Sequence, residues 1–309
     1  MLLSKDMFTK DSLLILFRNI VTKDNLILFL LLLPALVAVG YFVYYAILWN
    51  VIVSVSNWEG LKIDYTFKGF EQYFKLFNDE VFLISLTNNI VLIVLFVPLC
   101  LLVGLSLAIL MDQKVRYEGV FRTIYLLPFT LSFVVTAYLW LWMYNPQMGV
   151  INTLLRRAGL GFLTSQWIAD PNIVLLCIVI ALVWQFGGYV MLIFLAGIKS
   201  IPDSQLKAAM VDGASGFYLY RRIIIPQIKA STFTAFVILM VFALKAFDFI
   251  FVLTEGGPGY ASEILPLTMY QESFAVTHFA TGSAIASILF CLVLLIIVPY
   301  LYRTYRVEK

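Results

Sequence analysis

The chain has 309 residues, of which 62% are hydrophobic and 13% are charged, and its formal net charge is +3. A soluble domain carries about 25% charged residues, so this composition excludes an ordinary water-soluble core and indicates a protein that lies in a bilayer. The small net charge argues against nucleic-acid binding, because such proteins present a strongly basic face to phosphates.

Six charge-poor runs are long enough to cross a bilayer, since a spanning helix needs about 20 apolar residues. They cover residues 26–53, 84–111, 124–144, 173–198, 232–253 and 281–302. Only the fifth run contains charged residues, namely Lys245 and Asp248. The sequence therefore predicts an all-α polytopic membrane protein with six transmembrane helices, preceded by an N-terminal segment of residues 1–25.

The distribution of basic residues predicts how the chain is oriented. If the N-terminus is cytoplasmic, the inside segments hold 15 Lys and Arg and the outside loops hold 5. Cytoplasmic loops carry the excess of Lys and Arg, so both termini are expected in the cytoplasm of a multi-pass inner-membrane protein. No cleavable signal peptide is expected, and residues 13–21 fit either an amphipathic surface helix or a frayed tail.

The sequence lacks the residue patterns of a metal site, a catalytic triad and an ATP-binding loop. Cys100, Cys177 and Cys291 each lie in an apolar run, and the chain has a single histidine, His278. These residues form no metal-ligand spacing and no catalytic triad. No glycine is followed by lysine, as a phosphate-cradling loop would require. If ATP drives this protein, another polypeptide must hydrolyse it.

The loop between the fourth and fifth runs has readable local signals. Ser200 and Asp203 have the spacing of a capping box, which predicts a short helix. Gly213 can end that helix in a left-handed conformation. Ser215 can cap a second helix, which Pro226 is expected to close.

The same loop resembles the EAA signature of binding-protein-dependent ABC import permeases. The matching residues are Ala208, Ala209, Asp212, Gly213, Ala214 and Pro226. Lys207 stands where the family has a glutamate, which favours an asymmetric pair with a more regular partner permease. In that family this segment, here residues 199–226, is the coupling loop that docks into a cleft on the cytoplasmic ATPase.

The resemblance extends over roughly residues 26–303 and is tightest over 85–260. Fragments similar to maltose-type sugar permeases recur in order along the chain. They include Thr87-Asn88-Asn89, Gly149 with Asn152, Leu195-Ala196-Gly197, Phe247-Asp248 and Gly256-Gly257-Pro258. The Gly-Gly-Pro tripeptide favours the carbohydrate branch. The resemblance implies a type-1 ABC importer permease fold, with its core over residues 84–303.

The resemblance implies that transport, ATP hydrolysis and sugar delivery are carried out by different subunits. This chain would be a permease subunit and not an enzyme, and it would bind no cofactor itself. ATP and Mg²⁺ would bind to two ATPase subunits. A second homologous permease, making a heterodimer, and an extracytoplasmic sugar-binding protein would complete the importer.

Candidate substrate contacts lie on two runs. A sugar site needs aromatic faces and hydrogen-bonding groups. The fourth run offers Trp184, Gln185 and Tyr189, with Gly187-Gly188 permitting a close backbone approach or a kink. The fifth run offers Phe242, Ala243, Ala246 and Phe247. The resemblance implies that these two helices line the path. Ordinary helix packing is the alternative reading, and the small alanines suggest that the partner permease makes most ligand contacts.

Lys245 and Asp248 lie three residues apart, so on one helix they would face each other. They either form a polar wall of the path or an intramembrane ion pair that fixes this helix. Asn88 and Asn89 are expected to bond across helices in a structural role. Arg156 and Arg157 lie in an amphipathic stretch and either meet a docking protein or stay solvated, which is the favoured reading.

Two other classes of protein compete with this interpretation. An ion-coupled secondary transporter of a small polar solute would need midplane carboxylates in repeated halves, and only Asp248 qualifies. A membrane enzyme would need clustered His, Cys or carboxylates, which the sequence does not supply.

Overall fold

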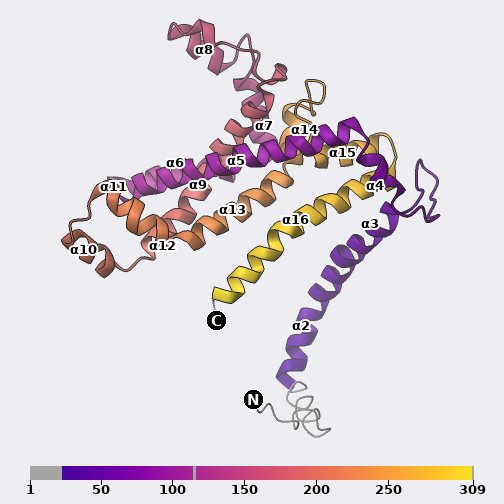
Figure 1. Ribbon diagram of the computed structural model, residues 1–309, viewed down its shortest axis with the longest axis horizontal. Coiled ribbons are helices and arrows are strands. Elements are labelled where there is room, and N and C mark those ends of the chain that lie inside the picture. Colours follow the sequence, from indigo (N-terminus) through magenta and orange to yellow (C-terminus); the bar gives the residue numbers. More distant parts are fainter. Residues whose placement is uncertain (1–22, 114–115, 308–309) are drawn as a thin grey trace.

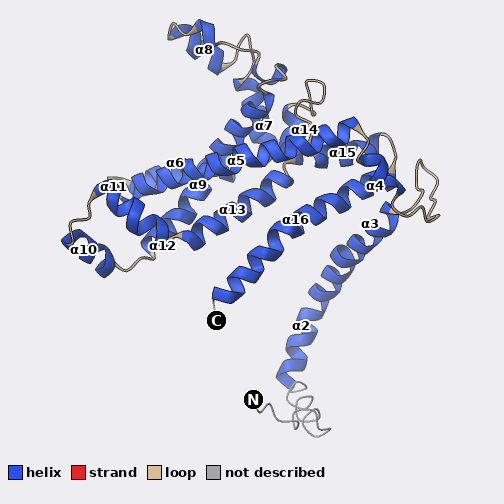
Figure 2. Ribbon diagram, in the orientation of Figure 1, coloured by secondary structure: helices blue, strands red, loops and turns tan. Residues whose placement is uncertain are grey.

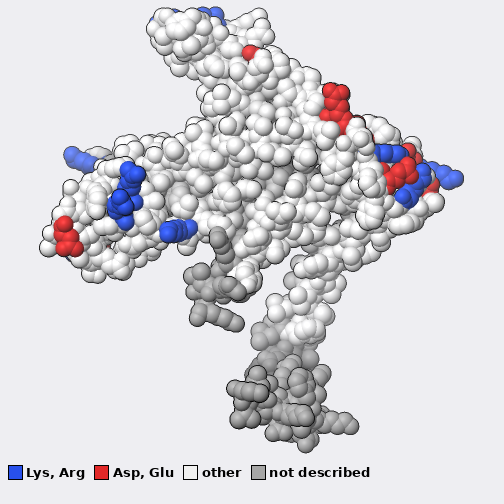
Figure 3. All heavy atoms as spheres, viewed as in Figure 1, with Lys and Arg blue, Asp and Glu red and all other residues white. Residues whose placement is uncertain are grey.

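The computed structural model describes residues 23–113 and 116–307, and this part of the chain consists of helices joined by loops (Figures 1 and 2). The predicted amphipathic stretch of residues 13–21 lies outside the described residues. Four helices are long and apolar enough to cross a membrane, and the number is six if each of two bent helix pairs is one span. Figure 3 shows charged side chains gathered toward the ends of the molecule, with a wide uncharged surface between them.

The first span is a nearly continuous rod. It consists of α2 (Lys23–Val39), the π-helical η2 (Gly40–Tyr45) and α3 (Ala46–Ser54). Its large apolar side chains are almost all exposed, which a helix tolerates only in lipid or against another protein. The rod leans away from the other helices and meets them near α16 (Phe279–Val307), where the Asn50 amide donates to Ser287 Oγ at 3.0 Å (Figure 1).

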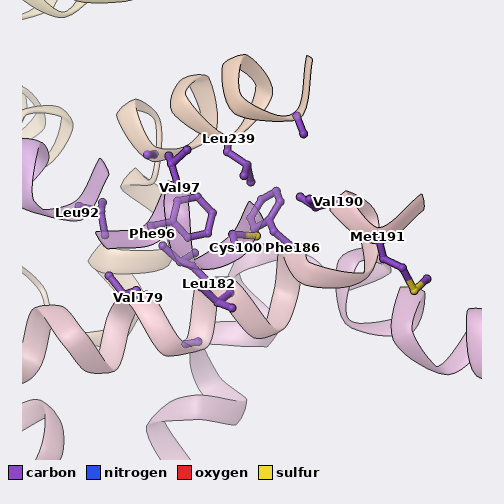
Figure 4. Packing of buried hydrophobic residues seen from close by; sticks show 14 of the residues in the cluster. Leu92, Phe96, Val97, Cys100, Val179, Leu182, Phe186, Val190, Met191 and Leu239 are labelled. Atoms are coloured by element: carbon purple, nitrogen blue, oxygen red, sulfur yellow. The ribbon is translucent and has the colours of Figure 1, made fainter. Parts of the chain in front are cut away.

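The core forms where α5 (Glu80–Asp112) packs along α9 (Val174–Lys199). Both helices are apolar on nearly every face, as expected for helices surrounded by protein and lipid. Phe96 of α5 packs edge-on against Phe186 of α9, with ring centroids 5.7 Å apart. Figure 4 shows these rings interleaved with Leu182 and with Leu239 of α13 (Lys229–Leu244). This pairing fixes the position of the elements around it.

The third predicted span is bent, and it is one span if its two parts cross the membrane together. It is divided into α6 (Glu118–Thr130) and α7 (Phe133–Met143), which meet at 97°. Leu131 and Ser132 take extended conformations between them, and the Ser132 hydroxyl caps α7 by accepting from Val135 N at 3.3 Å. A serine cap inside an apolar run therefore starts a new helix.

The fifth predicted span is also interrupted. α13 ends at Leu244, and α14 (Phe247–Leu253) begins after a two-residue link of Lys245 and Ala246. The expectation that Lys245 and Asp248 share one continuous helix is therefore wrong. No ion pair joins them among the described residues. The intramembrane ion pair between these two side chains is absent from this conformation.

A compact loop joins α14 to α15 (Leu265–Tyr270), which continues into η6 (Gln271–Ala275). The peptide bond between Gly257 and Pro258 is cis, and the glycines on either side have positive φ. Asn88 on α5 donates to the carbonyls of Tyr260 and Glu263 at 3.0 and 2.9 Å. Asn89 accepts from Leu265 N at 2.8 Å. The structural role predicted for the two asparagines is confirmed.

Short helices complete the chain. α4 (Glu71–Leu76) precedes α5, and α8 (Val150–Arg157), η3 (Gly161–Leu163) and η4 (Trp167–Ala169) lie between α7 and α9. α10 (Asp203–Val211), α11 (Gly216–Leu219), η5 (Tyr220–Ile224) and α12 (Ile225–Gln227) lie between α9 and α13. These two groups contain the surfaces that bear on function.

Candidate functional site

The segment from α10 to α12 projects from one end of the molecule (Figure 1). It is held to the bundle by a row of buried apolar residues, namely Ile201, Ala214, Leu219, Ile224 and Ile228. The Tyr220 hydroxyl also donates to Asp112 Oδ2 at the end of α5, at 2.9 Å. Lys199 Nζ lies 3.2 Å from Glu118 Oε1 at the start of α6. The projecting segment is therefore bonded directly to α5 through Tyr220, and the Lys199 ion pair joins the end of α9, from which the segment emerges, to α6.

The end of α10 is a Schellman motif built on Gly213. This glycine has a φ of +90°, a conformation that side chains with a Cβ rarely adopt. Gly213 N donates to Met210 O at 3.1 Å, and Ala214 N donates to Ala209 O at 2.9 Å. The prediction that Gly213 ends the helix in a left-handed conformation is confirmed.

Two other local predictions for this loop were wrong. The N-cap of α10 is Pro202, and the Ser200 hydroxyl instead donates back to Gly197 O at 2.7 Å, so no capping box forms. Ser215 occupies the N-cap position of α11, but its side chain makes no capping hydrogen bond. Pro226 lies inside α12, and the chain bends by 70° after Gln227 to enter α13. In contrast to the two caps, the prediction that Pro226 closes the second helix holds to within one residue, because that helix ends at Gln227.

The outer surface of this segment exposes large apolar side chains among charged ones such as Lys207 and Asp212. Ala208 and Lys207 are exposed, whereas Ala209 is half-buried against the core. Val211 and Phe217 are 87% and 76% exposed, and Met210 and Tyr218 are exposed beside them. Large apolar side chains gathered on a firmly held projection are typical of a protein-binding surface. The sequence analysis missed these four residues because α10 and α11 are too short for a clear periodicity.

The candidates on α9 divide between two environments. Trp184 is partly exposed and packs edge-on against Trp140 of α7 at 5.8 Å. Gln185 is buried, and its amide donates to Leu131 O at the α6–α7 bend at 3.1 Å, while its Oε1 has no partner among the described residues. Tyr189 stacks on Phe129 at 4.4 Å. All three candidates therefore contact the broken third span, through Trp140, Leu131 and Phe129.

The two glycines after Gln185 serve close packing. α9 is continuous from Val174 to Lys199, so no kink occurs there. A Cβ built on Gly188 would lie 2.5 Å from the carbonyl carbon of Tyr125 on α6 and nearer still to its oxygen. The close backbone approach, one of the two predicted alternatives, is the one that the structure adopts.

The candidates on the fifth span are also separated. Ala243 and Ala246 are fully buried within the chain, and Phe242 packs on Phe186 at 4.7 Å. Lys245 is exposed and lines, with Phe247, a cavity of about 460 Å³. The cavity lies between α13, α15 and α16 and is otherwise lined mostly by apolar residues, among them Met269, Tyr270 and Leu289. Asp248 is exposed elsewhere and is not part of this lining.

A buried carboxyl lies beneath the Gly-Gly-Pro turn. Glu263 is 1% exposed, and Thr268 Oγ1 donates to its Oε1 at 3.1 Å. Burial raises the pKa of Glu263 from 4.5 to about 7. Between pH 4.5 and about pH 7, the Glu263 carboxyl is protonated in the folded chain and ionised in the unfolded chain. The free energy of unfolding therefore falls as the pH rises through this range. The sequence analysis did not single out this residue.

The family of the chain can now be stated. Residues 100–307 match the family model described as "Binding-protein-dependent transport system inner membrane component". This match covers more than half of the sequence, so the chain belongs to that family.

Among the described residues no group of three or more His, Cys, Asp or Glu side chains is placed to hold a metal ion.

Relatives and solved structures agree with this assignment. A probable ABC transporter permease protein of Pyrococcus horikoshii is 57% identical, with 91% of this chain and 96% of that protein covered. A xylose/arabinose import permease protein of Haloferax volcanii is 44% identical, with 84% and 81% covered. A chain of the bacterial alginate ABC transporter, in complex with an alginate pentasaccharide-bound periplasmic protein, aligns with a TM-score of 0.79 at 23% identity over 95% of this chain and 98% of that chain. The fold is therefore that of a type-1 ABC importer permease.

Proposed function

We propose that this chain is a permease subunit of an ATP-driven importer that carries a sugar across the cytoplasmic membrane. Two relatives support the substrate class: one is a xylose/arabinose import permease, and another, 30% identical, is a trehalose/maltose transport permease. The Gly-Gly-Pro turn at Gly256–Pro258 is the matching feature within this sequence. A monosaccharide and an oligosaccharide fit these names equally well.

The observation that carries the mechanism is the exposed apolar surface on α10 and α11. It is the docking site for an ATPase, and the ATPase subunits bind ATP and Mg²⁺. Tyr220 ties this surface to α5, and the surface follows directly on α9, whose last residue, Lys199, is ion-paired with Glu118 of α6. Closure of two ATPase subunits on ATP would thus rotate those helices as a unit and expose the substrate path alternately to either side.

The remaining parts of the importer follow from the same proposal. Both termini lie in the cytoplasm, as the bias in Lys and Arg indicates. A second, homologous permease completes the path, and Lys207 in place of the usual glutamate favours a heterodimer. An extracytoplasmic binding protein delivers the sugar, in line with the periplasmic protein bound to the alginate transporter.

The substrate path runs beside α9 and the break between α13 and α14. Trp184 offers an aromatic face, and the buried amide oxygen of Gln185 has no partner within residues 23–113 and 116–307. Lys245 and Phe247 line the adjoining cavity. Ala243 and Ala246 are buried in the chain, so they shape packing and leave ligand contacts to other residues and to the partner permease.

A matched pair of proline substitutions tests the docking site. Gly213→Pro removes the Schellman motif of α10, since proline cannot adopt a φ of +90°. Gly159 ends α8 in the same motif, with a φ of +76° and a bond from Leu160 N to Leu155 O at 2.8 Å. Gly159→Pro therefore applies the same backbone damage at a distant position.

We expect Gly213→Pro to insert normally but to lose the ATPase from a mild-detergent pull-down and to lose sugar uptake. Gly159→Pro should keep the ATPase. Retention of the ATPase and normal uptake by the Gly213 variant would refute the docking site. Recovery of the unmodified chain alone, well folded and without a second permease or ATPase, would favour an ion-coupled transporter and direct attention to Asp248.

A further inference from the structure

The loop between α7 and α9 carries a second apolar projection, and its interior is rigidly built. Asn152 is buried and donates to Pro146 O at 3.0 Å and to Ser165 O at 2.9 Å. It also accepts from the Trp167 indole at 2.8 Å. The Asn152 side chain thus joins α8 to the segment before it, at Pro146, and to the segment after it, at Ser165 and Trp167. These bonds hold the surface of the loop in place.

The exposed side of this loop is apolar. Met148 and Phe162 are 78% and 80% exposed, and Leu154 on α8 is 60% exposed. Nothing in the described part of the chain covers them, as Figure 1 shows for α8, which stands apart from the other helices. A rigid loop that exposes three large apolar side chains to water alone would be costly.

The two arginines of α8 have different surroundings. Arg156 bonds to the carbonyls of Asn152, Pro146 and Gln147, so it fixes the loop and is not simply solvated as predicted. Arg157 is exposed and makes no hydrogen bond or ion pair within residues 23–113 and 116–307. It lies three residues after Leu154, so the charge and the apolar side chain share one face of α8.

The depth of the loop is set by its contacts with the spanning helices. The Tyr144 hydroxyl donates to Cys177 O in the first turn of α9 at 2.9 Å, and Trp167 packs on the Tyr144 ring at 6.0 Å. The loop is therefore held at the level where α9 enters the membrane. The exposed face of α7 leads directly to it, with Tyr138 and Trp142 as large exposed aromatic residues.

We propose that α8 and the following turn to Leu163 are an in-plane membrane anchor, with Leu154 and Phe162 inserted among the acyl chains and Arg157 on a lipid phosphate. An amphipathic helix with arginine at the edge of its apolar face suits this interface. Figure 3 shows Lys and Arg atoms at the tip that carries α8, beside an otherwise mostly uncharged surface, as such a position requires. The anchor would hold the bent third span against the bilayer while the other helices move.

Spin labels test this proposal in the assembled transporter. Phe162→Cys and Leu154→Cys are labelled with a nitroxide in a Cys291→Ser background, because Cys291 is the exposed cysteine and Cys100 and Cys177 are buried. The protein, with all subunits that copurify, is placed in liposomes of phosphatidylglycerol and phosphatidylethanolamine. Gln166→Cys is the control, since Gln166 is an exposed polar residue of the same loop.

We expect collisions with oxygen to exceed those with a water-soluble nickel chelate at positions 154 and 162, and the reverse at 166. Arg157→Glu should shift the label at 162 toward water, more so in anionic lipid. Equal nickel access at 162 and 166 would mean a solvated loop, and low access to both reagents would mean burial against a protein subunit. Either result overturns the anchor and leaves the ATPase docking site unaffected.

Discussion

Substitution of two adjacent glycines on α9, Gly187 and Gly188, by alanine is expected to affect stability differently. A Cβ at Gly188 would lie 2.5 Å from the carbonyl carbon of Tyr125, which is part of the α6 backbone and cannot rotate away. A Cβ at Gly187 would meet only Val103 Cγ1, at 3.3 Å. The two alanine variants therefore compare a clash with backbone, at position 188, with a mild side-chain contact, at position 187.

The size of the effect follows from these distances. Gly188→Ala requires α6 and α9 to separate by roughly 1 Å, an overpacking that costs about 3 kcal/mol. Alanine in place of helical glycine returns about 1 kcal/mol, so the net loss is about 2 kcal/mol for Gly188→Ala. Gly187→Ala should be close to neutral, because the same gain offsets a shift of a few tenths of an ångström. For a chain of this size, 2 kcal/mol corresponds to a Tm lower by about 4 °C.

Thermal unfolding in mild detergent measures this difference, with a thiol-reactive fluorescent dye as the reporter. The chain carries Cys291→Ser, because Cys291 is exposed; the remaining Cys100 and Cys177 are buried on α5 and α9, so they react only when the core opens. Both variants are compared with the parent chain at one scan rate, since membrane proteins often unfold irreversibly. If Gly188→Ala and Gly187→Ala melt together, the backbone approach of α6 to α9 is not as tight as the structure has it.

Three further predictions concern polar groups. Glu263→Gln removes a buried carboxyl with a pKa of about 7, so it should raise the Tm relative to the parent at pH 8 and leave it unchanged at pH 4; an equal gain at both pH values would mean that ionisation is not the cause. Asn152→Ala leaves the Pro146 and Ser165 carbonyls and the Trp167 indole without their hydrogen-bond partner, so it should lower the free energy of unfolding by about 3 kcal/mol. Asn172→Ala, at an exposed position, is the control and should change it by less than about 0.5 kcal/mol. Tyr220→Phe loses only the bond to Asp112, so sugar-stimulated ATPase activity should fall while ATPase binding persists; loss of binding instead would place the tyrosine in the docking surface itself.

Predictions that rest on local chemistry agreed with the structure where one residue controls the outcome. Gly213 was predicted in a left-handed conformation because a helix end followed by a glycine favours it, and its φ is +90°. Asn88 and Asn89 are predicted to make structural hydrogen bonds across helices; Asn89 bonds to the first residue of α15, whereas Asn88 bonds to the loop that precedes it. The capping box at Ser200 failed because its hydroxyl satisfied a nearer carbonyl of α9.

Breaks within apolar runs were the main error, since hydropathy reports whether a run is apolar and not whether it is straight. Ser132 and the Lys245–Ala246 link interrupt runs that read as single spans. The break between α6 and α7 receives a hydrogen bond from a distant residue, Gln185, to the Leu131 carbonyl. A residue 54 positions away in sequence cannot be inferred from local composition.

The sequence by itself determined that the chain crosses a membrane several times and that one polar loop matches a coupling signature, because apolar length and short-range spacing are properties of the chain alone. Only the tertiary structure decided which surfaces remain exposed. The apolar residues of α10, α11 and α8 resemble core residues in the sequence, and they are recognised as surface only when the bundle is seen to leave them uncovered. Burial depends on contacts between distant segments, and that is why it required the fold.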